Sequence, residues 1–141
     1  MGLAENKALV RRLFEAINGG DLEELSQLVA PDVVDHNAVI FMQPEGPGGV
    51  EEGIRMLREG FPDFHVAVEE LVAEADRVAA RLTLSGTNTG DYRGLPAPTG
   101  RRFESEAVAI LRIAGDRVAE LRGTADRMGM LTQLGILPDI G

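Results

Sequence analysis

Residues 64–85 read FHVAVEELVAEADRVAARLTLS. Apolar and polar side chains alternate on either side of a turn expected at Ala75–Asp76, which is the period-two pattern of two half-buried strands. Two more strands are predicted over about 102–113 and 117–124, joined by a tight turn at Gly115–Asp116. The second half of the chain therefore predicts an antiparallel meander.

The first half has the period of helices. Apolar residues recur every three to four positions over residues 4–18 and again over 22–29, and Gly19–Gly20 separates these two predicted helices. A third helix is predicted over about 50–61, and a short strand at Val33–Val34 precedes it. Three helices before a meander predict an α+β fold in which a curved antiparallel sheet closes over an apolar pocket.

The predicted strand around Val108–Ile113 is apolar at nearly every position. Both faces of the sheet are therefore expected to be buried there, one against the helices and the other against a second copy of the chain. We expect a homodimer through the outer face of the sheet.

Composition excludes several classes of function. The chain has 141 residues, enough for one domain over 1–141, and a net charge of −9, which argues against nucleic-acid and membrane partners. It has no cysteine, and its two histidines, His36 and His65, lack the spacing of zinc ligands, so no metal or cofactor is expected. With no signal peptide or membrane-spanning run visible, we expect a cytoplasmic location.

Two acidic positions are candidates for proton transfer. The cluster Asp35-His36-Asn37 follows a short apolar strand, where pockets often open. A carboxylate at the mouth of an apolar cavity suits proton transfer near neutral pH, because desolvation favours its neutral form. The alternative is that Asp35 caps a turn and His36 is solvated. Asp63, after Pro62, could face the same cavity or simply begin a turn.

Three further side chains could contact a bound molecule. Asn88 has the parity of the apolar residues in the strand before it, so its amide could orient a substrate oxygen, although asparagine is also common in turns. Tyr92 could cover a ligand or pack on Pro96. Phe41 belongs to the apolar segment of the loop 38–48, which is a candidate for the rim of a pocket.

The order of these elements resembles that of the SnoaL-like polyketide cyclases, within the nuclear-transport-factor-2-like superfamily of cone-shaped α+β folds. The resemblance covers nearly the whole chain and implies a dimer with a deep apolar cavity. Such cyclases close a ring by intramolecular aldol addition without metal or cofactor. In chain order the markers are Val10-Arg11-Arg12 with Phe14, Pro31-Asp32, Gly86 to Gly90, Gly94-Leu95-Pro96 with Pro98-Thr99, Arg101-Arg102-Phe103, Leu111-Arg112-Ile113 and Gln133-Leu134-Gly135.

The resemblance also implies an aspartate on the last strand and a histidine on the strand before it. This chain has Gly123 and Ala109 at those positions. By parity they share a face with Leu121, which predicts an apolar floor of small residues for a bulky ligand. Other branches of the superfamily place carboxylates near Asp35 and Asp63, and this analogy makes Asp35 the best base, with His36 or Asp63 as its partner.

Three hypotheses follow. The first is a cyclase or isomerase acting on a small hydrophobic, polyketide-like molecule, with Asp35 as the general base and Asn37 or Asn88 orienting the substrate oxygen. The second is a hydroxylase or an epoxide-opening enzyme on the same scaffold. The third is a non-catalytic binding or assembly protein, which the missing aspartate and histidine would suit.

Overall fold

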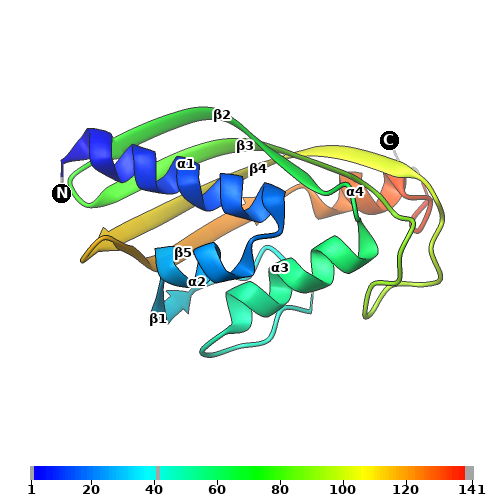
Figure 1. The fold of residues 1–141 in the computed structure, drawn as a ribbon. Helices are drawn as coiled ribbons and strands as arrows, with labels where there is room; N and C mark the ends of the chain where they lie inside the picture. The colour runs from blue at the N-terminus through cyan, green and yellow to red at the C-terminus, as the bar shows by residue number, and fades with distance from the viewer. Residues whose placement is uncertain (1, 41, 139–141) are drawn as a thin grey trace.

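The computed structural model describes residues 2–40 and 42–138. A curved five-stranded sheet has three helices against one face and a fourth helix after the last strand (Figure 1). In chain order the elements are α1 (Leu3–Gly19), α2 (Leu22–Leu28), β1 (Val29–Asp35), α3 (Gly49–Gly60), β2 (His65–Glu74), β3 (Arg77–Thr87), β4 (Arg102–Ala114), β5 (Arg117–Ala125) and α4 (Arg127–Gln133).

The strand order is β1-β5-β4-β3-β2, and the α+β fold with a curved sheet is confirmed. The sheet is antiparallel except at its β1 edge, where β1 runs parallel to β5. A parallel neighbour needs a long connection between the two strands, and here α3 and three other strands lie between β1 and β5 along the chain. The strand β1 also begins at Val29, four residues before the strand predicted from Val33.

Helix ends follow the chemistry of their residues. The first helix stops at Gly20, which has a left-handed backbone (φ +66°) and donates its N–H to the Ile17 carbonyl at 3.1 Å. Asp21 then caps α2, since its Oδ1 accepts the Glu24 N–H at 3.0 Å. This sharp turn lets α1 and α2 lie against the same concave face of the sheet (Figure 1).

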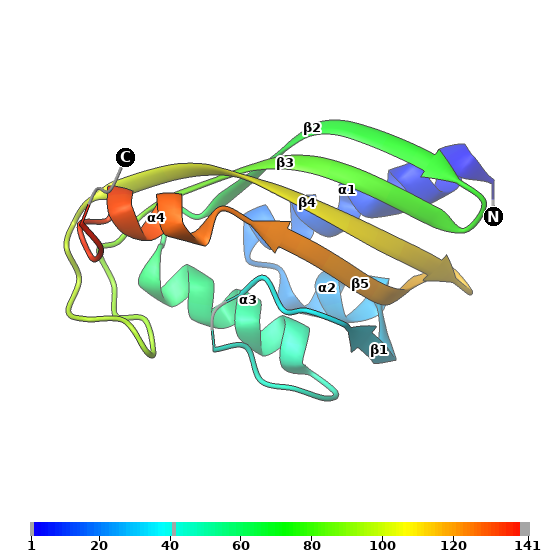
Figure 2. The same cartoon turned by 180° about the vertical axis from the view of Figure 1, so that it is seen from behind.

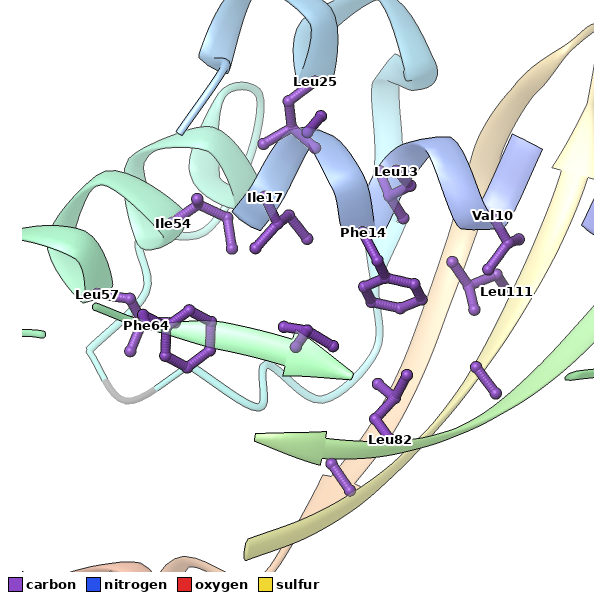
Figure 3. Close-up of a cluster of buried hydrophobic side chains, with 14 of the residues drawn as sticks. Val10, Leu13, Phe14, Ile17, Leu25, Ile54, Leu57, Phe64, Leu82 and Leu111 are labelled. Carbon is purple, nitrogen blue, oxygen red and sulfur yellow. The ribbon is translucent and has the colours of Figure 1, made fainter. Parts of the chain in front are cut away.

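The core lies between that concave face and the helices. Figure 3 shows Leu13 and Phe14 of α1 pointing toward the strands, with Leu82 of β3 and Leu111 of β4 among the side chains that face them. All four are buried, and Leu111 is fully enclosed. Burying one such side chain stabilises the fold by roughly 1.5–3 kcal/mol, so the sheet and helices depend on each other for stability.

The outer face of the sheet is turned away from α1, α2 and α3, as the view from behind shows (Figure 2). Three apolar side chains on this face, Val72, Val108 and Ile110, are 59%, 43% and 40% exposed in the single chain. The expected burial against a second copy stays a prediction. Within residues 2–40 and 42–138, no helix is both long and apolar enough to span a membrane.

Candidate active site

A cavity of about 210 Å³ lies between the concave face of the sheet and the helices. Its walls are mostly apolar, with contributions from α1, α3, α4, all five strands and the loops after β1 and β3. Polar residues also line it: Asp35, Gln43, Tyr92, Ser105, Arg122, Asp126 and Arg127. An apolar chamber with a few polar groups is the usual form of a site for a small organic ligand.

Small residues form much of the wall contributed by β4 and β5. Ala109 lies opposite Gly123 in the antiparallel ladder, and Leu111 lies opposite Leu121. All four line the cavity, together with the pair Ala107 and Ala125. The alternation of the strands therefore does put Ala109, Leu121 and Gly123 on one face, while their contact with a substrate stays a prediction.

The space above Gly123 is filled from the loop after β1. A Cβ atom built on Gly123 would lie 2.5 Å from Cγ2 of Val39. The main chain of this loop is held in place by Arg127, whose Nη2 donates to the Val39 carbonyl at 2.8 Å and also to the Ala38 carbonyl. A side chain larger than glycine at position 123 therefore requires Val39 to move.

Asp35 ends β1 and lines the cavity. Its Oδ2 accepts a hydrogen bond from Nε2 of Gln43 at 3.0 Å. Its other oxygen, Oδ1, has no hydrogen-bond partner among the residues that the structure describes. The group is half-buried and keeps one oxygen available to a ligand.

The structure does not bring His36 to this carboxylate. His36 Nε2 lies 3.1 Å from Glu120 Oε1, and Glu120 also accepts a hydrogen bond from Arg112. Arg112 first, and then His36, lower the pKa of Glu120 to about 2. His36 is not among the residues that line the cavity, because neighbouring residues at the end of a strand point to opposite faces. Pairing it with Asp35 as a catalytic partner is therefore not supported.

The side chain of Asn37 binds the main chain of β5 and does not line the cavity. Its Oδ1 accepts the main-chain N–H of Gly123 at 3.0 Å, and its Nδ2 donates to the Gly123 carbonyl. The side chain thus continues the pairing of β1 with β5 for one more step. Its two polar atoms are occupied by the main chain, which leaves it poorly placed to orient a substrate oxygen.

Asp63 and Asn88 organise turns, and neither lines the cavity. Asp63 Oδ2 accepts the Thr87 hydroxyl at 2.7 Å and its Oδ1 accepts the Thr87 N–H at 2.6 Å, and these bonds lower the pKa of Asp63. Asn88 is 1% exposed. Its Oδ1 accepts the Thr99 N–H at 3.2 Å, and its Nδ2 donates to the Gly90 carbonyl at 3.1 Å. The turn interpretation of both residues fits these bonds.

Tyr92 is buried and lines the cavity. It fits against α3 because Gly60 has no side chain: a Cβ there would lie 2.8 Å from Cβ of Tyr92. Its ring centroid is 6.1 Å from that of Phe61. Burial raises the pKa of Tyr92 to about 12, against a smaller opposing effect of Arg127, so the phenol stays protonated at neutral pH. Phe41 lies outside the described residues.

Sequence reasoning missed five polar residues of the cavity lining, namely Gln43, Ser105, Arg122, Asp126 and Arg127. Ser105 is 7% exposed, and its hydroxyl makes no hydrogen bond within the part of the chain that the structure describes. Its parity with Ala107 and Ala109 was a usable signal. Gln43 had none, since it lies among prolines and glycines and meets Asp35 only after the chain folds. Among residues 2–40 and 42–138, no three His, Cys, Asp or Glu side chains gather as metal ligands would.

This architecture defines a small α+β protein with a mostly apolar cavity that has a carboxylate in its lining. The model of the SnoaL-like polyketide cyclases matches residues 7–134, and the chain belongs to this family. Where the family resemblance implies an aspartate and a histidine, the cavity wall has Gly123 and Ala109.

Several known proteins are similar over most of the chain. It is 30% identical over 135 residues to aklanonic acid methyl ester cyclase AcmA of Streptomyces galilaeus, covering 94% of this chain and 92% of AcmA. It is 29% identical over 125 residues to the nogalonic acid methyl ester cyclase of Streptomyces nogalater, covering 87% and 92%.

Two solved structures, both from Streptomyces, match with a TM-score of 0.85. TsrD of Streptomyces laurentii is 29% identical, with 97% of this chain and 99% of TsrD covered. AclR of Streptomyces galilaeus, a proposed hydroxylase, is 30% identical, with 99% of this chain and 87% of AclR covered.

Proposed function

We propose that this protein is a cyclase that closes a ring in a hydrophobic polyketide-like molecule, with Asp35 as the acid–base group. One observation carries the assignment of the base: Asp35 presents an unpaired carboxylate oxygen to an apolar cavity. Asp126 also lines the cavity, but it is exposed whereas Asp35 is half-buried, and its Oδ1 caps α4 by accepting the Gly129 N–H at 2.8 Å. The curated relatives named above are cyclases, which favours cyclisation over hydroxylation, epoxide opening or binding without chemistry.

The chemistry needs only one carboxylate. Oδ1 of Asp35 takes a proton from a carbon next to a carbonyl group of the substrate. The resulting enolate carbon attacks a second carbonyl carbon of the same molecule, which forms the ring bond and leaves an alkoxide. The alkoxide takes the proton back from Asp35. The product has the mass of the substrate, and the carboxylate is regenerated.

Two other groups suit the binding of substrate oxygens. The Ser105 hydroxyl points into the cavity from β4 and can donate to a carbonyl whose charge grows during the reaction. Tyr92 contributes a protonated phenol to the same cavity. The apolar walls hold the rest of the molecule and exclude water, which strengthens such polar contacts.

To test this proposal, the protein is incubated with the two esters that appear in the names of its relatives, aklanonic acid methyl ester and nogalonic acid methyl ester. The reaction is followed by liquid chromatography with mass detection. Cyclisation gives a product of unchanged mass, whereas hydroxylation adds the mass of one oxygen atom. We expect Asp35→Asn to lower turnover at least tenfold, about 1.4 kcal/mol in the barrier.

Asp32→Asn is the matched control, because Asp32 is exposed on the same strand and does not line the cavity. It should retain full turnover. Unchanged turnover in Asp35→Asn would remove Asp35 from the mechanism. A wild-type chain that converts neither ester would refute the proposed activity on these compounds.

We also propose that the protein acts as a homodimer through the outer face of the sheet. The support is the exposed apolar group formed by Val72, Val108 and Ile110. Ion pairs flank it, with Arg81 beside Glu70 at 3.4 Å and Arg112 beside Glu120. An apolar centre with a charged rim is typical of a protein–protein interface.

A further inference from the structure

Two glycines of α3 allow the loop after β1 to lie directly on the helix. Gly49 and Gly53 are four residues apart and therefore share one face of α3. A Cβ on Gly49 would overlap the carbonyl oxygen of Pro44. A Cβ on Gly53 would lie 3.0 Å from both Cγ and Oε1 of Gln43. The absence of these two side chains therefore makes the space in which residues 43 and 44 sit.

Gln43 reaches Asp35 from this position. Its main-chain N–H donates to the Ile40 carbonyl at 3.2 Å, which turns the loop back toward β1. Its side-chain Nε2 then donates to Asp35 Oδ2 at 3.0 Å. The two residues are eight apart in sequence and come from a strand end and an irregular loop, so the contact depends on the seat that α3 provides.

We infer that Gln43 is a positioning residue that holds the Asp35 carboxylate by Oδ2 and leaves Oδ1 to act on the substrate. This inference rests on the proposed function of Asp35. An amide N–H is uncharged and does not titrate in water, so it can stabilise and orient a carboxylate without competing for the proton. Without this bond, the carboxyl group can rotate and present neither oxygen at a fixed place.

Of the polar side chains around Asp35, Gln43 is the one that binds its carboxylate. The residue after Asp35, His36, pairs with Glu120 away from the cavity. The other charged residues of the lining are Arg122, Asp126 and Arg127. Arg122 lies opposite Ile110 in the ladder, so its side chain is directed to the outer face, while Asp126 caps α4 and Arg127 binds carbonyls of the loop. Within the described residues, the Asp35 side chain accepts a hydrogen bond from Gln43 alone.

The first test measures the contact itself and needs no substrate. The side-chain amide resonance of Gln43 is identified in a ¹H–¹⁵N spectrum by its loss in Gln43→Met. We expect it to shift in Asp35→Asn and to stay in place in Asp32→Asn. A resonance unmoved by Asp35→Asn would overturn the inference.

The second test separates orientation from packing by turnover of the two methyl esters. Methionine fills much of the volume of glutamine but cannot donate, so Gln43→Met should lower kcat about tenfold and change KM less than about threefold. Gln27→Met, on the exposed face of α2, is the control and should match the wild type.

Gln43→Glu keeps the shape of the side chain but puts a second carboxyl group beside Asp35. Two adjacent carboxylates hold a shared proton more tightly. We therefore expect the acidic limb of the pH profile of kcat/KM to move to higher pH, with activity partly recovered above it. A residue that only fills space would leave the profile unchanged.

The outcomes distinguish this inference from the proposed function. If the wild type converts an ester, Asp35→Asn does not, and Gln43→Met retains kcat, the positioning role is wrong while the function of Asp35 stands. If Asp35→Asn also retains turnover, or the wild type converts neither ester, both ideas fail, whatever the amide resonance shows.

Discussion

Individual side chains near the cavity differ in whether their polar atoms are already occupied. Asp63, Asn37 and Asn88 have sequence surroundings as suggestive as those of Asp35, yet their oxygens accept main-chain hydrogen bonds. Asp35 Oδ1 accepts none from the residues that the structure describes. A buried or half-buried polar atom that the fold leaves unsatisfied is available to a ligand, and this separates the candidate base from its neighbours.

Asp63 gives a prediction about stability rather than catalysis. Its pKa is lowered by the Thr87 hydroxyl and main-chain N–H, so its carboxylate stabilises the fold at pH values above the pKa of the unfolded chain. That stabilisation is lost as the pH falls through the lower pKa of the folded state. Asp63→Ala should therefore cost about 1 kcal/mol near neutral pH, a value reduced by the exposure of the site, and less in strong acid.

Thermal unfolding of the wild type and Asp63→Ala across an acidic pH series measures this difference. Turnover of the esters should be unchanged, because Asp63 does not line the cavity. A gap in Tm that stays constant as the pH falls would show that the charge of Asp63 is irrelevant. A loss of turnover in a folded variant would return Asp63 to the list of catalytic candidates.

Secondary-structure elements were the part that the sequence predicted well. Alternation over residues 64–85 and the three- to four-residue period over 4–18 are local signals. The strands β2 and β3 and the helix α1 form where these signals predict them. The pairing of β1 with β5 is not local, which explains why its parallel direction was missed. One position decides which way a strand residue faces, so His36, one residue after Asp35, contacts Glu120 and not the carboxylate for which it was a candidate partner.

The candidate site was predictable only where it lies on regular strands. Parity placed Ala109, Leu121 and Gly123 on the cavity wall because β4 and β5 alternate without a break there. The contact of Gln43 with Asp35 arises between a loop and a strand end, and it depends on the glycines of α3. No periodic pattern marks such a contact in advance.

The helix α3 provides a prediction of its own. Gly53→Ala should raise helix stability by about 0.5–1 kcal/mol, since alanine has the higher helix propensity. The added Cβ would also press on Gln43 at 3.0 Å and disturb its bond to Asp35. We therefore expect a Tm equal to or above that of the wild type together with a loss of kcat of about three- to tenfold.

Gly19→Ala is the matched control, because a Cβ on Gly19, near the end of α1, would meet nothing within 4 Å. Thermal unfolding and turnover of the methyl esters are measured on both variants. Full activity in Gly53→Ala would mean that Gln43 tolerates the pressure or has no part in the reaction. A large drop in Tm would instead indicate that the helix itself is distorted.

The assembled chain separates its two surfaces of interest. The cavity lies on the concave side of the sheet, among the helices, and the convex side is seen in Figure 2. Val72 and Ile110 are in register through Ala79 and have the parity opposite to Ala109 and Leu111 of the cavity wall, which directs them to the convex side. Strands carry both surfaces at once, because alternate residues of β4 point to opposite faces. Association of two copies through the convex face would therefore cover the side of the sheet opposite to the cavity.

Ile110→Glu tests the proposed dimer. A glutamate at the centre of the outer face would lose its hydration on association, at a cost of several kcal/mol that pairing with Arg122, opposite it in the ladder, would offset only in part. We expect sedimentation velocity to show the wild type as a dimer and Ile110→Glu as a folded monomer, with a dissociation constant raised at least a hundredfold. Leu3→Glu, an equally polar change at an exposed residue of α1, should remain dimeric. Because Ile110 does not line the cavity, the monomeric variant should keep most of its turnover. A wild type that sediments as a monomer would contradict the proposed dimer.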